Sequence, residues 1–204
     1  MKNKNYPLYD ITEISTLNQL IYDVPTIDKN IAFMYAKDKK TTVEITYARF
    51  RSDIEAFGTY LYCSGIKNTH IAVIGENSYE WILTYFSTVL GSNVIVPVER
   101  ELSAAEIKNV LISSDSTVLV YSGTYEDVVD ELKKHNLNIT YANMNDIPDL
   151  LAIGQKEIDV GNTEFINHKA NEGDLAAIVY TSGTTGASKG VMLTHENIAT
   201  NTVA

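Results

Sequence analysis

Two hydrophobic periodicities alternate along the chain from about residue 45 onward, and this alternation restricts the folds open to it. Short apolar runs of strand length recur at 70–75, 93–98, 117–121 and 138–142. Between them, apolar residues recur at spacings of three and four, as on one face of a helix. Because parallel strands need crossovers and these crossovers are right-handed, the sequence predicts a doubly wound α/β fold, with a mostly parallel sheet and helices on both faces.

The expected helices have recognisable ends. One begins after Thr46, a residue type that caps helices, and stops at Gly65. A second begins at Ser78 and ends at Gly91. A third begins with the sequence SAAE at 103–106, a capping box in which each outer side chain satisfies the backbone N–H of the other.

The patterns divide the chain into four stretches. Residues 1–44 are an irregular annex, with a short helix at LNQLIYDV and a strand at IAFMYA whose hairpin mate is VEIT. Residues 45–152 carry the β-α repeats. Residues 153–174 are polar and contain glycine, so we expect a surface connection there. Residues 175–204 contain a strand, a glycine-rich and hydroxyl-rich loop, and the start of a helix.

Charge and hydropathy limit the partners and the compartment. The 204 residues include 26 acidic and 16 basic side chains, a formal net charge of -10. A nucleic-acid backbone would be repelled by this charge, because no Lys/Arg run is longer than two residues. No stretch approaches about 20 apolar residues, and the N-terminus lacks the apolar block of a secretory signal. We expect no nucleic-acid partner, no transmembrane segment and a cytoplasmic location, with peripheral membrane association left open.

Several reactive or aromatic side chains are interpreted as structural. Cys63 is the single cysteine and has no basic neighbour at helical spacing, so it reads as an inert thiol. The four histidines have no ligand-like spacing, and no metal site is expected from this chain alone. His195 is interpreted as a histidine at a helix start that bonds to backbone, Trp81 as a core residue, and residues 99–101 as a solvated turn.

The segment YTSGTTGASKG, residues 180–190, carries the strongest chemical signal. Its glycines permit positive φ and close approach of the backbone to an anion, and its hydroxyls are rotatable donors. Lys189 adds a full positive charge, whose hydrogen bond to a phosphate contributes about 1.5 to 3 kcal/mol. The common nucleotide loop is excluded because Ser188 precedes the lysine and Gly190 follows it. The segment indicates polyphosphate handling; the alternative is a Gly/Ser/Thr turn without chemistry.

The longer segment YTSGTTGASKGVMLTHENI resembles the signature loop of the adenylate-forming (AMP-binding) superfamily, which includes acyl-CoA synthetases, adenylation domains of peptide synthetases and luciferases. Ser188 stands where proline is usual, which removes a rigid φ and predicts altered loop mobility. The segments ITYARF (45–50) and VLGSNVIVPVERELSAAEI (89–107) are similar to further family motifs. GENSYEW (75–81) is most similar to long-chain fatty acyl-CoA synthetases. The likeness spans residues 45–201.

This resemblance implies a two-step ligase. A carboxylic acid and ATP give an acyl-adenylate and pyrophosphate, and the thiol of CoA then takes the acyl group. Mg²⁺ would accompany ATP, and donors on the β and γ phosphates would stabilise the charge that develops as pyrophosphate departs. Lys189 would be the catalytic residue. The nucleotide cradle would consist of Thr181, Ser182, Gly183, Thr184, Thr185, Gly186 and Lys189.

In this family the adenine-binding segment, the acidic magnesium ligand and the catalytic lysine of the small C-terminal domain lie downstream of the loop. We therefore expect the 204 residues to be the N-terminal portion of a larger enzyme, unable to form an adenylate without its C-terminal part. Two alternatives stay open. One is an amino-acid adenylation domain that serves a carrier protein, and the other is a non-catalytic interaction module that binds a phosphorylated partner.

Overall fold

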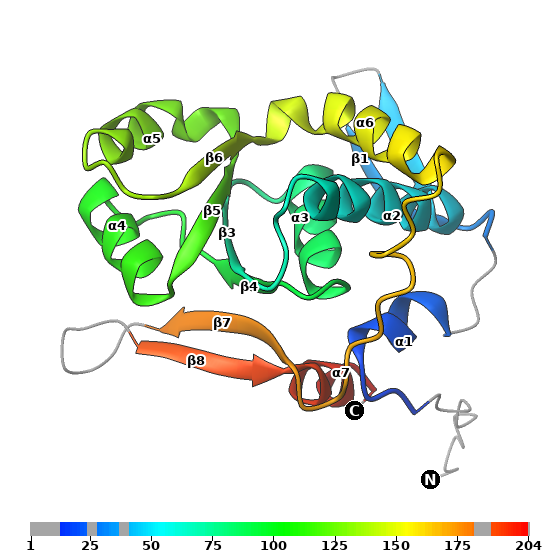
Figure 1. Cartoon of the computed structure of the whole chain (residues 1–204). Coiled ribbons are helices and arrows are strands. Elements are labelled where there is room, and N and C mark those ends of the chain that lie inside the picture. The colour runs from blue at the N-terminus through cyan, green and yellow to red at the C-terminus, as the bar shows by residue number, and fades with distance from the viewer. Residues whose placement is uncertain (1–12, 24–27, 37–40, 182–188, 204) are drawn as a thin grey trace, which may run out of the picture.

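A six-stranded sheet forms the centre of the computed structural model, which describes residues 13–23, 28–36, 41–181 and 189–203 (Figure 1). The strand order is β6-β5-β3-β4-β7-β8. Neighbouring strands are parallel except β7 and β8, which are antiparallel. The strands are β3 His70–Ile74, β4 Val94–Pro97, β5 Ser116–Tyr121, β6 Thr140–Asn143, β7 Leu175–Thr181 and β8 Lys189–Thr194. The predicted α/β fold with a mostly parallel sheet is confirmed.

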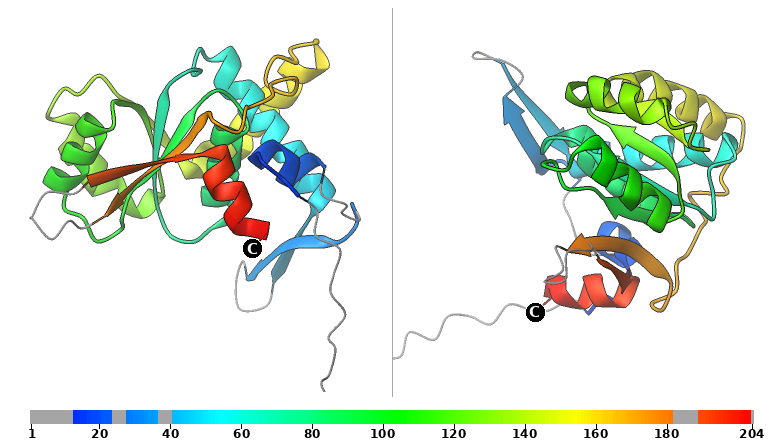
Figure 2. Two further views of the ribbon diagram at one scale, coloured as in Figure 1. Left: turned by 90° about the horizontal axis from the view of Figure 1, so that it is seen from below. Right: turned by 90° about the vertical axis from the view of Figure 1, so that its left-hand side faces the viewer.

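Helices cover both faces of the sheet (Figure 2). One face carries α2 (Tyr47–Cys63), α3 (Tyr79–Val89) and α6 (Ile147–Asp159), and the other carries α4 (Ala104–Ser113) and α5 (Glu126–Lys133). Successive side chains of a strand point to opposite faces. In β3, for example, Ile71 and Val73 join the first core and Ala72 and Ile74 join the second, all fully buried. Short 3₁₀ turns, η1 (Gly123–Tyr125) and η2 (Met144–Asp146), precede α5 and α6.

The N-terminal annex packs beside this sheet. Helix α1 (Leu17–Tyr22) and the antiparallel hairpin of β1 (Ile31–Ala36) and β2 (Thr42–Thr46) match the short helix and hairpin expected there. Helix α1 lies against α7 (His195–Val203), so both ends of the described chain meet at one side of the molecule (Figure 1).

The predicted helix caps are present. Thr46, Ser78 and Ser103 each accept a hydrogen bond from the backbone N–H three residues later, and Ser103 forms the full capping box with Glu106. Each such cap stabilises the fold by about 1 kcal/mol. Gly65 ends α2 with a φ of 79°, a left-handed conformation that glycine adopts without steric cost.

The prediction of a surface connection over residues 153–174 is wrong for residues 153–159, which belong to a helix. Helix α6 continues to Asp159, so only residues 160–174 lack helix and strand. The physical reason is at Gly154, which reads as a helix breaker in the sequence. A β-carbon at Gly154 would lie 1.8 Å from the carbonyl oxygen of Ala56, so the glycine lets α6 pack directly on α2. The remaining connection is mostly exposed but is anchored by Phe165, which is 2% exposed.

Candidate functional site

The β7–β8 hairpin presents the two described residues of the predicted nucleotide cradle. Thr181 ends β7, Lys189 begins β8, and the two lie opposite each other in the antiparallel register, both exposed. The remaining cradle positions, Ser182, Gly183, Thr184, Thr185 and Gly186, lie outside the described residues. The backbone register therefore pairs a threonine with a lysine at the two ends of the loop. The roles assigned to the seven residues stay predictions.

The end of this hairpin next to the loop is held in place by a neighbouring helix and by a close approach of β7 side chains to the backbone of β8. Tyr180 OH and Ser113 Oγ, at the C-terminal end of α4, are 2.7 Å apart in a hydrogen bond. A β-carbon at Gly190 would lie 2.9 Å from Ile178 Cγ2 and 3.2 Å from Tyr180 Cζ. Gly190 thus permits the side chains of Ile178 and Tyr180 on β7 to lie across β8.

The loop begins at the edge of the sheet where the parallel strands end. Because β7 is parallel to β4, Thr181 lies at the same carboxyl edge as the residues that follow β3 and β5. There, the Glu76 carboxylate accepts hydrogen bonds from the hydroxyls of Ser122 and Thr124. The bond from Ser122, followed by that from Thr124, lowers the pKa of Glu76 and keeps it charged. Open α/β sheets bind ligands outside this edge.

A second polar group at the same edge surrounds Glu126. Its carboxylate accepts hydrogen bonds from Tyr121 OH at 3.2 Å and from Asn143 Nδ2 at 2.9 Å. Burial, reinforced by this carboxylate, raises the pKa of Tyr121. Sequence reasoning missed both polar groups, although their residues end apolar strands or follow them within five positions. That position was the available signal, because the carboxyl ends of parallel strands meet in space.

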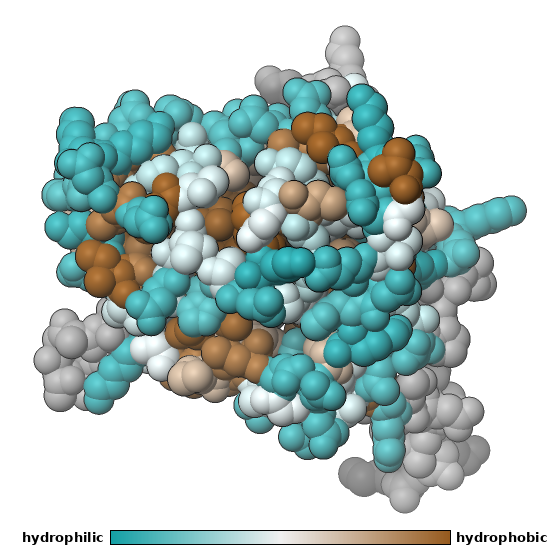
Figure 3. All heavy atoms as spheres, viewed as in Figure 1, coloured by the Kyte–Doolittle hydropathy of each residue, from teal (hydrophilic) through white to brown (hydrophobic). Residues whose placement is uncertain are grey.

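An apolar groove of about 400 Å³ lies beside β7 on the face that carries α3. Hydrophobic side chains also gather over β7 on the face shown in Figure 3, whereas hydrophilic ones cover most of α5. The groove is lined by Tyr85, Pro97, Ala177, Val179, Leu193, Asn197, Ile198 and Asn201. It places an apolar surface next to the strand that leads into the predicted phosphate loop.

The surroundings of His195 and Cys63 agree with the structural interpretation given to both side chains. His195 is 2% exposed, and its Nδ1 accepts a hydrogen bond from the backbone N–H of Leu17 at 3.3 Å. Burial lowers the pKa of His195, which keeps the ring neutral and able to accept this bond. Cys63 is exposed at the end of α2, and partial desolvation of its thiol together with the charge of Glu157 raises its pKa, which disfavours the reactive thiolate.

Within the described ranges, no three His, Cys, Asp or Glu side chains gather closely enough to hold a metal ion. No helix among the same residues is both long and apolar enough to cross a membrane.

The fold and the hairpin together define an α/β protein with a candidate phosphate loop at the carboxyl edge of a parallel sheet. The family model described as AMP-binding enzyme matches residues 27–204. The chain belongs to this family, which confirms the resemblance to adenylate-forming proteins seen in the sequence.

Individual relatives include different kinds of adenylating protein. Long-chain-fatty-acid–CoA ligase 5 of Rattus norvegicus is 28% identical over 224 aligned residues, covering 100% of this chain and 33% of the relative. The polyketide synthase-nonribosomal peptide synthetase ffsA of Aspergillus flavipes is 26% identical over 162 residues, covering 77% of this chain and 4% of the relative.

The fold also matches solved structures. Apo MatB from Rhodopseudomonas palustris superposes with a TM-score of 0.74 at 23% identity, covering 92% of this chain and 36% of MatB. This chain therefore spans about a third of the length of both the rat ligase and MatB.

Proposed function

We propose that this chain forms the N-terminal part of an ATP-dependent, AMP-forming acyl-CoA synthetase that acts on long-chain fatty acids. The observation that carries the proposal is the β7–β8 hairpin, which sets Thr181 opposite Lys189 at the carboxyl edge of the sheet in a chain of the AMP-binding family. Thr181 and Lys189 would bind the nucleotide together with Ser182, Gly183, Thr184, Thr185 and Gly186.

In the first step, a carboxylate oxygen of the acid attacks the α-phosphorus of ATP. The bond from this phosphorus to the bridging oxygen of the β-phosphate breaks, and pyrophosphate leaves with its electron pair. The Lys189 ammonium and the Thr181 hydroxyl would donate hydrogen bonds to the β and γ phosphates, where negative charge increases. Mg²⁺ would arrive with the nucleotide and neutralise part of the same charge.

In the second step, the thiol of CoA attacks the acyl carbon, and AMP leaves as the thioester forms. The hairpin has no covalent role in either step. The hydrogen bond between Tyr180 and Ser113 supports a positioning role for the hairpin. Catalysis by charge stabilisation requires donors that do not reorganise during the reaction.

The choice of a fatty acid is supported by the apolar groove beside β7. Its lining by Tyr85, Val179 and Ile198 suits a hydrocarbon chain, which gains about 0.8 kcal/mol for each buried methylene. The similarity to the rat long-chain ligase, which extends over all of this chain and a third of the ligase, and the GENSYEW segment support the same choice.

The test is Lys189→Ala in the enzyme that contains this chain, with Lys134→Ala on the exposed end of α5 as a matched loss of charge. We expect Lys189→Ala to lower kcat/KM for ATP in acid-dependent pyrophosphate exchange about ten- to a hundredfold, the loss expected for a hydrogen bond to a charged group. Lys134→Ala should leave the exchange unchanged. Equal kinetics of wild type and Lys189→Ala would remove Lys189 from this role.

An amino-acid adenylation domain that serves a carrier protein is the second candidate, and the similarity to the A. flavipes peptide synthetase favours it. A substrate panel separates the two. Fatty acids that support exchange, followed by thioester formation with free CoA, would support the synthetase. Exchange with amino acids alone, and transfer only to a phosphopantetheine carrier, would support the adenylation domain.

A further inference from the structure

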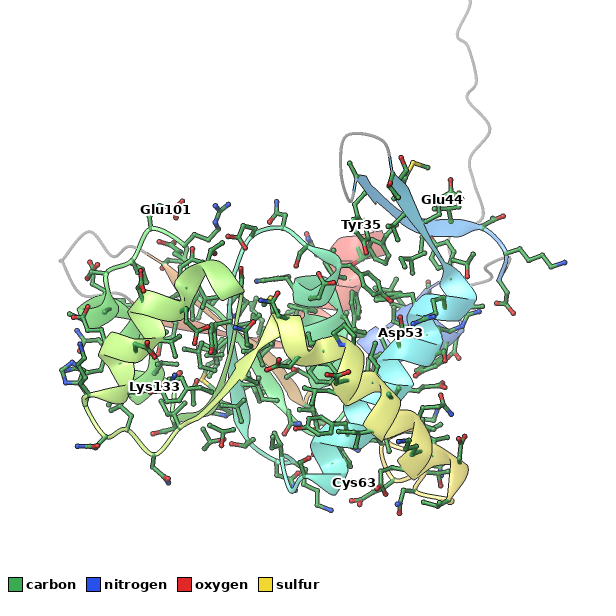
Figure 4. All side chains as sticks on the ribbon, turned by 90° about the horizontal axis from the view of Figure 1, so that it is seen from above. Tyr35, Glu44, Asp53, Cys63, Glu101 and Lys133 are labelled. Atoms are coloured by element: carbon green, nitrogen blue, oxygen red, sulfur yellow. The ribbon has the colours of Figure 1, made fainter. Side chains whose placement is uncertain are left out.

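A separate cavity of about 490 Å³ opens between the β1–β2 hairpin and helices α2, α3 and α6. None of its described lining residues belongs to β7 or β8. Ile45, Leu83 and Leu151 are among its apolar lining residues. Figure 4 shows two of the polar ones, Tyr35 on β1 and Asp53 on α2, at the side of the molecule where the hairpin meets α2. The volume is in the range of small-molecule sites.

A buried carboxylate lies in the wall of this cavity. Asp53 is only 6% exposed, although charged residues are rarely buried without partners. Its Oδ1 accepts a hydrogen bond from Arg49 Nε at 2.6 Å, and its Oδ2 accepts one from Tyr79 OH at 2.8 Å. The charge of Arg49 is therefore matched by Asp53.

Glu80 gives the cavity its excess charge. It lines the same space, and its carboxylate forms no ion pair within the part of the chain that the structure describes. Among the lining residues that the structure describes, one positive group, Arg49, and two negative groups, Asp53 and Glu80, leave a net charge of −1. Two aromatic rings, Tyr35 and Tyr79, complete the polar side. A carboxylate without a cation, set beside aromatic rings, is the arrangement that recognises an ammonium group.

The cavity walls are held by close contacts on both sides. Gly154 of α6 touches the backbone of Ala56 on α2, and Ala56 itself lines the cavity. On the hairpin side, the ring of Phe33 packs edge-on against Phe50 at 4.8 Å and against Tyr79 at 5.8 Å. The space is therefore a preformed gap between packed elements.

We propose that this cavity binds a small organic cation, a protonated amine on an apolar chain. The ammonium group contacts the Glu80 carboxylate and the rings of Tyr35 and Tyr79, and the hydrocarbon lies along Ile45, Leu83 and Leu151. The site is independent of the nucleotide hairpin and of the adenylation reaction, so its test does not depend on activity.

Calorimetry on the 204-residue chain at pH 7.5 tests this site with three probes of equal chain length: hexylammonium, 1-hexanol and hexanoate. Hexylammonium should bind with one site per chain, and the neutral and anionic probes about tenfold more weakly or not at all. Glu80→Gln should weaken hexylammonium about tenfold, because it removes the charge while keeping the shape. The control is Glu44→Gln, which removes the same charge from an exposed position on the hairpin outside the cavity lining (Figure 4).

A second variant, Ser52→Phe, inserts a ring at an exposed lining position and should abolish binding. Thermal unfolding of each variant establishes that it is folded. Three results would overturn the site. The first is that hexylammonium does not bind to the wild type, and the second is that hexylammonium and hexanol bind equally well. The third is that Glu80→Gln and Glu44→Gln weaken hexylammonium binding equally, which would mean a general attraction of cations to the acidic chain.

Discussion

His195 couples the two ends of the described chain through one hydrogen bond. Its ring is buried between the start of α7 and the start of α1, where its Nδ1 accepts from Leu17 N–H. Burial lowers its pKa most, the charge of Asp174 acts in the opposite direction, and His168 lowers it further. The pKa of His168 is itself lowered by burial. Both rings thus resist protonation in the folded state.

This depressed pKa predicts a loss of stability in mild acid. Below about pH 6.5 the unfolded chain binds a proton on His195 more readily than the folded chain does. The contribution of the neutral His195 ring to the free energy of unfolding is complete above about pH 6.5 and falls as the pH drops below this value. It stops changing below the pKa that His195 has in the folded state. The slope is at most about 1.4 kcal/mol per pH unit for each histidine. Urea unfolding between pH 7.5 and 5.5 measures it.

His195→Asn keeps an acceptor for Leu17 N–H but cannot be protonated, so it should reduce the slope. The control is His135→Asn, because His135 is exposed after α5. If His195→Asn leaves the slope as steep as in the wild type, His195 does not carry the pH dependence.

At the scale of elements, the contact between α2 and α6 depends on Gly154. Alanine in an exposed helix is more stable than glycine by about 1 kcal/mol. At Gly154, however, the added methyl group would meet the Ala56 carbonyl at 1.8 Å and force the helices apart. We expect Gly154→Ala to lower the free energy of unfolding by about 1 to 3 kcal/mol, as overpacking does.

Urea denaturation measures this change, and Gly173→Ala is its control because nothing lies within 4 Å of a β-carbon there. A Gly154→Ala protein as stable as the wild type would show that α2 and α6 can separate without cost.

The elements that the sequence predicts correctly are those with strong local signals. The stripes and caps of α2, α3 and α4 define those helices without reference to their neighbours. Helix α6 is different, because Gly154 weakens its local helix signal and only its contact with Ala56 explains the glycine. Tertiary packing overrides local propensity here.

The candidate site shows the same division. Its glycines, hydroxyls and Lys189 are visible in the sequence because they are contiguous. The antiparallel register that pairs Thr181 with Lys189 is not written in the sequence of the loop. The hydrogen bond between Tyr180 and Ser113 is not visible either, because it joins residues 67 positions apart in the chain. The contact between Glu76 and Ser122 is also not visible in the sequence, because the two residues are 46 positions apart.

At the scale of the whole molecule, the parallel sheet collects functional groups at one edge. Strands β3, β5 and β6 bring the polar groups around Glu76 and Glu126 to the edge at which β7 delivers the loop. An apolar groove lies beside the same strand. The hairpin with Thr181 and Lys189 and the apolar groove thus lie on adjoining surfaces, as the proposed function requires.

The most direct test of this account is acid-dependent exchange of labelled pyrophosphate into ATP by the enzyme that contains this chain. With Mg²⁺ present and fatty acids of increasing length, the account predicts exchange that requires the acid and is fastest with long chains, since each buried methylene adds about 0.8 kcal/mol of binding. A folded enzyme that exchanges no pyrophosphate with any carboxylic acid would contradict it.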